Sequence, residues 1–542
     1  MAPADLPALN VGFEFECWIA TIYIDVERGD YPYKGERVFV LTGTNSTGSE
    51  VSVETRTSDG EILTDGYNKW NPAPDDWNPN EDRMPTEAVV QGMQNSFLTT
   101  VANVVGSEKV SNLNTEHPNV GDLVDGVSRA FRQHTAHRDD GRERNLSSKT
   151  WRKDTHVYEG KLYFVAFEWR TRVYVRANKE GGKVMREELR VILKRIPEEH
   201  NVSINAGNDC FYELPPSIKT KHSVQPGEAR AGIHIHVSAE GVFDTPTQGL
   251  TVEEHREQRE EIMKKRILAS KKLITLYWLV EPNICKLHAS WRSKDPRYAG
   301  LLRHHSNLAF YLLDQEQKDN SPYKHWEHDK EENQNKAKGH YNKGNFDTHG
   351  KIAEEDLDSE AKTMYDAVIA KLPGESEDRK LERKTIKTIW SCTNMDQLVW
   401  LCASYFGNRR AALSLNQLLP AYGSIYNGGG LREPAQRLGT VEFRAMQGSF
   451  DPEAVIAWSD VVMRLTEPCV TEGTDAFVNF VNRVMEAPEP GDTVKAFIKR
   501  LGFDEESRPY KFYSDGLQAR LDIEAMPRIG GDSTPNVLVP RK

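Results

Sequence analysis

The chain has 542 residues, enough for one large decorated domain or for roughly two to three ordinary ones. Its hydrophobic share of 38% supplies a sizeable core and argues against wholesale disorder. The formal net charge of -11 excludes the basic surface of a typical nucleic-acid-binding protein. A substrate that carries phosphate would have to be met by local arginines or by metal ions, because the overall field repels it.

In chain order, hydrophobic periodicity predicts strands and helices that alternate with polar loops. The predicted strands cover residues 11–24, 161–175, 231–240 and 439–446. The predicted helices cover residues 86–105, 185–196, 252–280 with a stop near Pro282, 359–372, 395–405 and 453–466. Polar composition marks insertions at about 43–85, with a hairpin around 51–62, and at 314–346. We expect one domain over residues 1–487 and an appendage of helix and loop over 488–542.

The cysteines and the apolar segments of the sequence indicate the cellular compartment of the protein. The six cysteines form no CxxC pair, and a chain of this length does not need disulfides, so we expect reduced, mostly buried thiols, with a catalytic cysteine as a minor alternative. The first residues lack the basic and apolar regions of a secretory signal. The most apolar helical run, 267–280, is short and is interrupted by Lys271 and Lys272. We therefore expect a cytoplasmic protein with neither a membrane nor a nucleic acid as partner.

The first predicted strand carries two carboxylates on one face. Residues i and i+2 of a strand point to the same side, so Glu14 and Glu16 share a face opposite Phe13, Phe15 and Cys17. Two like charges this close are costly unless a cation neutralises them. The same pattern is also common on ordinary solvated strands, and alone it indicates little about function.

The strand at 231–240 repeats this arrangement with imidazoles. His234 and His236 share one face, whereas Ile233, Ile235 and Val237 point toward the core. A neutral imidazole is a common transition-metal ligand and also contacts phosphate oxygens. The alternative is a pair of histidines on a solvated strand face.

Two further strands combine carboxylates with guanidinium groups. Glu442 and Arg444 share a face in the strand at 439–446, and Glu168, Arg170 and Arg172 share one in the strand at 161–175. Such neighbours are usually simple ion pairs. Near a metal, a glutamate can act as ligand while an arginine holds a phosphate or carboxylate with two hydrogen bonds.

If these strands form one antiparallel sheet, their polar faces line a single concave surface. Its oxygen ligands favour Mg²⁺ or Mn²⁺ over zinc, although the histidines leave zinc as an alternative. No Walker motif, GxGxxG, HExxH or GxSxG occurs in the chain, which excludes the commonest phosphate-loop, dinucleotide, zincin and serine-hydrolase classes. The histidines between His304 and His349 suggest zinc, but their polar context without cysteines favours a solvated loop.

The order Gly-x-Glu-x-Glu, His-x-His and Glu-Phe-Arg resembles the amidoligase family, part of the carboxylate–amine ligase group that shares its catalytic fold with glutamine synthetase and glutamate–cysteine ligase. The segment 232–237 is similar to the family strand Gly-(Leu/Met)-His-Val-His-Val, and 440–450 is similar to Thr-(Ile/Val)-Glu-Phe-Arg-x-x-x-Gly-(Thr/Ser). The segment 288–308, with Arg292 and Arg303, resembles the family segment in which an arginine precedes a helix. Patches of resemblance extend over about 11–465, without the insertions. The family has Ser-Pro where Trp-Arg-Thr follows Glu168, and the match at Asn416 leaves its register open.

The expected fold is α+β: a curved antiparallel sheet, or half-barrel, of the glutamine synthetase-like catalytic type, with helices on its convex side and large insertions. The resemblance implies an ATP-dependent ligase that forms an amide between a carboxylate and an amine through an acyl phosphate, with ATP and Mg²⁺ or Mn²⁺ as cofactors. It implies metal ligation by Glu14, Glu16, His234 and Glu442, with Glu168 as a looser match. It further implies phosphoryl contacts from Arg444 and Arg292, and ATP contacts from His234, His236 and Arg444.

Three alternatives stay open at this point. A phosphotransferase of the same fold would stop at a phosphorylated product, a metal hydrolase would use the same ligands without ATP, and a binding protein would have lost the chemistry. The glutamates at 14, 16 and 442 argue against the last of these. The substrates are expected to be a small-molecule or peptide carboxylate and an amine, whose identities the sequence does not give, and it predicts no oligomeric state. We expect Met446 and Trp458 to lie in the core.

Overall fold

The structure is a computed structural model of the chain. It describes residues 7–25, 38–43, 52–56, 87–110, 123–124, 127–128, 133, 135–138, 144–146, 150–153, 156–159, 161–199, 202–203, 232–239, 241–243, 252–288, 299–312, 359–370, 377–403, 411–418, 439–471, 473–485 and 494–514. The predicted insertion at 314–346 and most of the one at 43–85 lie outside these residues. The part of the predicted appendage that follows residue 514 lies outside them too.

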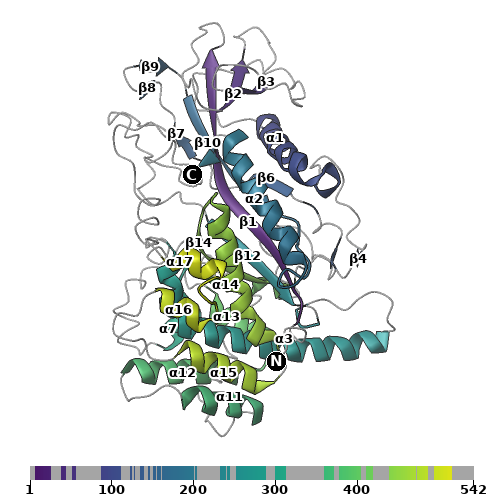
Figure 1. Cartoon of the computed structure of the whole chain (residues 1–542), viewed down its shortest axis with the longest axis vertical. Coiled ribbons are helices and arrows are strands. Elements are labelled where there is room, and N and C mark those ends of the chain that lie inside the picture. Colours follow the sequence, from purple (N-terminus) through teal and green to yellow (C-terminus); the bar gives the residue numbers. More distant parts are fainter. Residues whose placement is uncertain are drawn as a thin grey trace, which may run out of the picture.

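One mixed sheet organises the described part (Figure 1). Its main path runs β13–β14–β12–β1–β10–β6, and all neighbours on this path are antiparallel. In that order the strands are Leu413–Ser414, Val441–Gln447, Gly232–Ala239, Leu9–Asp25, Lys161–Arg170 and Thr135–Arg138. The long strand β1 therefore lies between the histidine strand β12 and the Glu168 strand β10.

The remaining strands lie off this path. β2 (Val38–Gly43) pairs in parallel with β1 and antiparallel with β3 (Ser52–Arg56), while β7 (Arg144–Leu146) pairs with β10 and β11 (Val202–Ser203) with β1. Two separate pairs are β4 (Leu123–Val124) with β5 (Val127–Ser128), and β8 (Thr150–Lys153) with β9 (His156–Glu159). β3 lies within the hairpin predicted around 51–62, but its partner β2 precedes that range, and residues 57–62 lie outside the described residues.

The register of the sheet sorts its side chains onto two faces. Phe15 lies opposite both Ile233 and Trp169, and its neighbour Glu14 lies opposite both His234 and Arg170. Because successive residues alternate between faces, one side of the sheet is apolar and the other is lined by charged and imidazole groups. The alternation predicted from the sequence is therefore confirmed.

Helices cover the apolar face. Phe97 of α1 (Glu87–Val105) packs with its ring 5.9 Å from Trp169, and Tyr277 of α3 (Val252–Ile284) packs 6.1 Å from Phe443. Figure 1 shows α2 (Gly181–Glu199) and α14 (Pro452–Val470) in front of the sheet. Met446 and Trp458 are buried in this core, as predicted.

The other described helices gather mainly at one end of the molecule (Figure 1). They are α6 (Leu302–His305), α7 (Asn307–Leu312), α11 (Ser359–Ile369), α12 (Glu377–Ser391), α13 (Met395–Cys402), α15 (Thr474–Val484), α16 (Val494–Arg500) and α17 (Arg508–Ser514). Short 3-10 turns cover Ser107–Lys109, Cys285–Leu287 and Asn416–Leu418. The prediction of a mixed helix and sheet architecture is confirmed, although α12 and α15 were not predicted.

The long helix ends within two residues of the predicted stop near Pro282, although the proline itself lies inside the helix. α3 continues to Ile284 with Pro282 inside it. Proline cannot donate a hydrogen bond to the carbonyl four residues earlier, which belongs to Trp278. Arg303 Nη1 donates to that oxygen instead, over 3.3 Å, and its guanidinium lies over the Trp278 ring. A residue from a later segment thus satisfies the carbonyl that the proline leaves without a backbone partner.

Candidate functional site

Charged and imidazole side chains of β1, β12, β14 and β10 gather on the polar face of the sheet. We call them the sheet-face cluster: Glu14, Glu16, Glu168, Arg170, His234, His236, Glu442 and Arg444. Most of these side chains are buried, and only the Arg170 side chain, 49% exposed, reaches well into solvent. Buried charges are stable only when they are paired, so the contacts within the cluster decide what it can bind.

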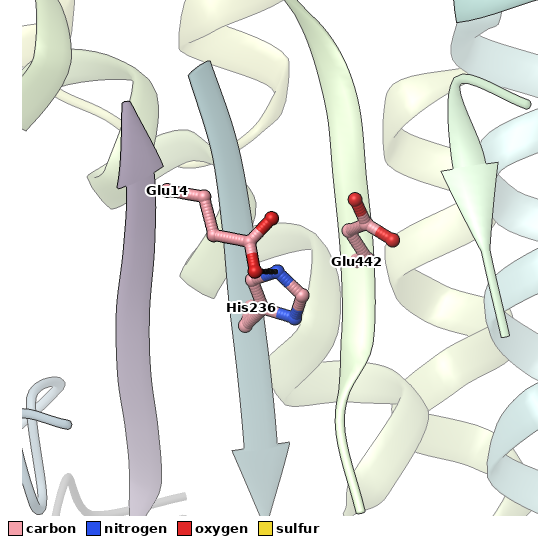
Figure 2. A group of neighbouring side chains, drawn as sticks. All are labelled: Glu14, His236 and Glu442. Carbon is pink, nitrogen blue, oxygen red and sulfur yellow. Dashed lines mark ion pairs between the residues drawn. The ribbon is translucent and has the colours of Figure 1, made fainter. Parts of the chain in front are cut away.

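Three members of the cluster form a candidate metal centre. Glu14, His236 and Glu442 each offer one ligand atom, and these atoms lie within 4.8 Å of one another. Figure 2 shows the three side chains converging from three neighbouring strands. Their register explains the convergence, because His236 lies opposite Glu442 on one side and Gly12, two residues before Glu14, on the other.

His236 presents a buried nitrogen to the two carboxylates. Its Nδ1 lies 3.2 Å from the Thr440 hydroxyl oxygen, whereas its Nε2 makes no hydrogen bond in the described structure. Glu14 Oε1 lies 3.4 Å from that Nε2, within ion-pair distance. A buried imidazole nitrogen beside two carboxylates is a donor set that fits a divalent cation.

His234 lies between the carboxylates in a different way. Its Nδ1 lies 3.2 Å from Glu14 Oε2, 3.3 Å from Glu442 Oε1 and 3.3 Å from Arg444 Nη1, while its Nε2 lies 3.5 Å from Glu16 Oε1. One ring nitrogen either donates or accepts, so it cannot satisfy all three neighbours at once. His234 Nδ1 therefore links the carboxylates, while His234 Nε2, like that of His236, is buried and makes no hydrogen bond among the described residues.

An irregularity in β14 brings Arg444 into the cluster. Ile233 pairs with Met446 and Ile235 with Phe443, so residues 444 and 445 together oppose His234 alone. Such a bulge re-aims a side chain locally. Arg444 Nη1 donates to Glu442 Oε1 in a short contact and reaches His234, while the Arg444 backbone N–H donates to Ala412 O over 2.8 Å.

The outer carboxylates are held by other groups. Glu16 Oε2 accepts a hydrogen bond of 2.8 Å from the Gly232 backbone N–H. Arg170 Nε lies 3.2 Å from Glu14 Oε1 and donates to Glu168 Oε1 over 2.5 Å. Glu168 thus belongs to the same face, although its contact is with Arg170 rather than with the three candidate ligands.

The electrostatics favour ionised carboxylates. Burial opposes ionisation of Glu14, but Arg170 and both histidines outweigh it and hold its pKa well below the ordinary value. Burial likewise opposes ionisation of Glu442, and Arg444 with the two histidines lowers its pKa. The pKa of His234 is lowered by burial and by Arg444, whereas Glu14 and Glu442 raise that of His236 against the effect of burial.

Carboxylates of neighbouring strands approach one another within the cluster. Two like charges held this close are costly unless a cation lies between them. A divalent cation would therefore suit the position between Glu14 and Glu442.

Seven of the predicted site residues come together on one face: Glu14, Glu16, Glu168, His234, His236, Glu442 and Arg444. The metal ligands predicted from the sequence were Glu14, Glu16, His234, Glu442 and Glu168. The convergent ligand atoms belong to Glu14, His236 and Glu442. Arg292 lies outside the described residues, as does the side chain of Asn416. Thr440 was part of a quoted motif but received no role. Its place two residues before Glu442 was the only signal in the sequence that it shares this face.

Other candidate groups have structural partners. Arg303 lies 3.4 Å from Glu382 and supports the Trp278 carbonyl. Burial raises the pKa of the Cys285 and Cys392 thiols to about 12, so neither is a ready nucleophile. Within the described ranges, Glu14, His236 and Glu442 form the sole group of three or more acidic, histidine or cysteine side chains close enough to hold one metal ion.

Comparisons with known proteins give no match: no family model, no curated protein and no solved structure corresponds to this chain. None of the helices that the structure describes has both the length and the apolar character needed to cross a membrane.

Proposed function

We propose that this protein is an ATP-dependent ligase that joins a carboxylate to an amine through an acyl-phosphate intermediate. The convergence of Glu14, His236 and Glu442 on one buried sheet face carries this proposal. It is supported by the ordered resemblance of the three strand motifs to the amidoligases. We further propose that the sheet is of the glutamine synthetase-like type, because described helices pack on its apolar face and the candidate ligands line the other.

Glu14, His236 and Glu442 are the residues that would hold a divalent ion, Mg²⁺ or Mn²⁺. The buried His236 Nε2, which makes no hydrogen bond among the described residues, and its convergence with two carboxylates support this fit. When bound, such an ion would supply positive charge that stabilises a phosphoryl group in transfer.

The other side chains of the cluster would orient the reacting groups. Arg444 lies beside Glu442, so its guanidinium is placed to hold a phosphoryl oxygen next to that carboxylate. His234 and Arg170 hold the Glu14 carboxylate in place from two sides. Burial of most of the cluster limits the access of water, which would otherwise hydrolyse an acyl phosphate.

The test is ADP release by the purified protein with ATP, Mg²⁺ and a panel of amino acids and amines. Release that depends on both an acid and an amine, together with an amide product, is expected. Glu442→Gln should lower it at least roughly 100-fold, because it removes a ligand charge while keeping the shape of the side chain. The matched control is Glu188→Gln, which alters a carboxylate paired with Arg172 Nη2 over 2.9 Å outside the cluster and should leave release unchanged.

Other results would replace the ligase proposal. A stable phosphorylated product without an amide would indicate a phosphotransferase. Hydrolysis that needs metal but not ATP would indicate a metal hydrolase. Absence of nucleotide binding and turnover with either metal would contradict the proposal.

A further inference from the structure

The two histidines of the sheet-face cluster differ in the groups that contact their Nδ1 atoms. His234 Nδ1 faces two carboxylates and a guanidinium, whereas His236 Nδ1 faces the Thr440 hydroxyl at 3.2 Å. We infer that Thr440 is a positioning residue, which fixes the His236 ring so that Nε2 points at Glu14 and Glu442. This inference rests on the proposed function, because it assigns His236 as the metal-binding imidazole.

The physical reason is that an imidazole has two different nitrogens. Rotation of the ring exchanges their places, and the partner of one nitrogen decides which tautomer and orientation the other presents. With the hydroxyl oxygen accepting from Nδ1–H, Nε2 keeps its lone pair for a cation. A hydroxyl suits this role because it adds no charge to an already charged site.

Burial makes the contact between the Thr440 hydroxyl and His236 Nδ1 important for the orientation of the imidazole ring. Thr440 and His236 are 5% and 6% exposed, so water does not readily replace the hydroxyl when it is removed. The backbone also supports the placement: Gly439 has a φ of 53°, which glycine adopts at low cost, and it leads directly into Thr440 and β14. One short segment therefore carries both the positioning hydroxyl and the ligand Glu442.

The experiment measures Mn²⁺ binding at fixed pH by the loss of the free-ion electron paramagnetic resonance signal. Thr440→Val keeps the shape of the side chain but removes the hydroxyl, and it should weaken Mn²⁺ affinity roughly 10–100-fold. Thr440→Ser restores the hydroxyl and should recover most of that affinity. Thr466→Val is the matched control, since it removes a fully buried hydroxyl that donates to Val462 O within α14. It should leave Mn²⁺ affinity unchanged.

A second readout separates this inference from the proposed function. The ¹⁵N resonances of histidine-labelled protein without metal, assigned with His236→Gln, report the ring nitrogens directly. If Thr440→Val shifts the His236 Nδ1 resonance while the wild type binds no Mn²⁺, the positioning role stands and the proposed metal site fails. If the wild type binds Mn²⁺ and Thr440→Val binds it equally well, the positioning role is overturned. Equal melting temperatures of Thr440→Val and Thr466→Val would show that a changed affinity does not reflect unfolding.

Discussion

Among single residues, Glu281 shows how one buried carboxylate connects distant segments. It lies in α3, and its two oxygens accept hydrogen bonds of 2.7 and 2.8 Å from the backbone N–H groups of Leu302 and Arg303. Burial raises its pKa to about 7, although these two N–H groups and the Arg303 charge act in the opposite direction. Burial raises the pKa values of Tyr277, Cys285 and Cys402, and the nearby Glu281 charge adds to each of these shifts.

This shift predicts a pH dependence of stability. The folded-state pKa lies above the ordinary value of 4.5, so between about pH 4.5 and 7 the folded protein binds more protons than the unfolded chain. The free energy of unfolding should therefore fall as pH rises through this window, by on the order of 3 kcal/mol from this group.

The measurement is the urea midpoint from pH 5 to 7.5 for the wild type and for Glu281→Gln. The wild-type midpoint should fall more steeply with pH than that of the variant, because the variant has no proton to lose. Parallel curves for the two proteins would contradict a raised pKa at this position.

Residue types and faces in the cluster could be predicted, but their partners could not. Alternation along each strand is a local property, so the polar pairs at 14 and 16, at 234 and 236, and at 442 and 444 follow from the sequence. The convergence of Glu14, His236 and Glu442 depends on the register of strands about 200 residues apart in the chain. The bulge opposite His234 has no strong local signal either, since neither residue 444 nor 445 is a glycine.

At the scale of elements, the aromatic stack behind the cluster ties β1, β10 and α1 together. Trp169 is fully buried, its ring centroid lies 4.5 Å from that of Phe15 in a stacked arrangement, and Phe97 packs 5.9 Å away. Trp169 lies between Glu168 and Arg170 in β10, so this packing also helps to position these two side chains on the polar face.

Trp169→Ala should therefore cost about 3–5 kcal/mol of unfolding free energy, since it leaves a large cavity between sheet and helix. Trp169→Phe keeps a ring in the stack and should cost less. Urea unfolding of both variants provides the measurement. A loss below about 1 kcal/mol in Trp169→Ala would mean that the stack does not hold α1 on the sheet.

Helix boundaries could be predicted where a local signal such as a capping residue determines them. They could not be predicted where contacts with distant residues determine them. α14 begins at Pro452 after Asp451, whose side chain accepts the Glu453 N–H over 2.9 Å, and the prediction of a start at residue 453 is confirmed within one residue. α3 passes Pro282 because Arg303 supplies a donor to the Trp278 carbonyl. α12 was not predicted because its sequence is mostly charged, so the apolar pattern of the buried Ile386, Ile389 and Trp390 is weak.

At the scale of the whole molecule, we propose metal binding at the sheet rather than in the histidine-rich segments. The net charge of -11 attracts cations generally, so binding of a metal to the chain does not identify the site. The sheet-face cluster differs from exposed acidic surface because its ligand atoms are already convergent and largely buried. The histidines His325, His328, His340 and His349, which lie outside the described residues, are the natural competing location.

The most direct measurement is an anomalous-difference map from crystals of the wild-type protein grown with Mn²⁺. We expect a peak between the Glu14 carboxylate, His236 Nε2 and the Glu442 carboxylate. This peak should be absent in Glu442→Gln. A peak only at the histidine-rich segments, or none at the sheet-face cluster under conditions in which Mn²⁺ binds the protein, would contradict this expectation.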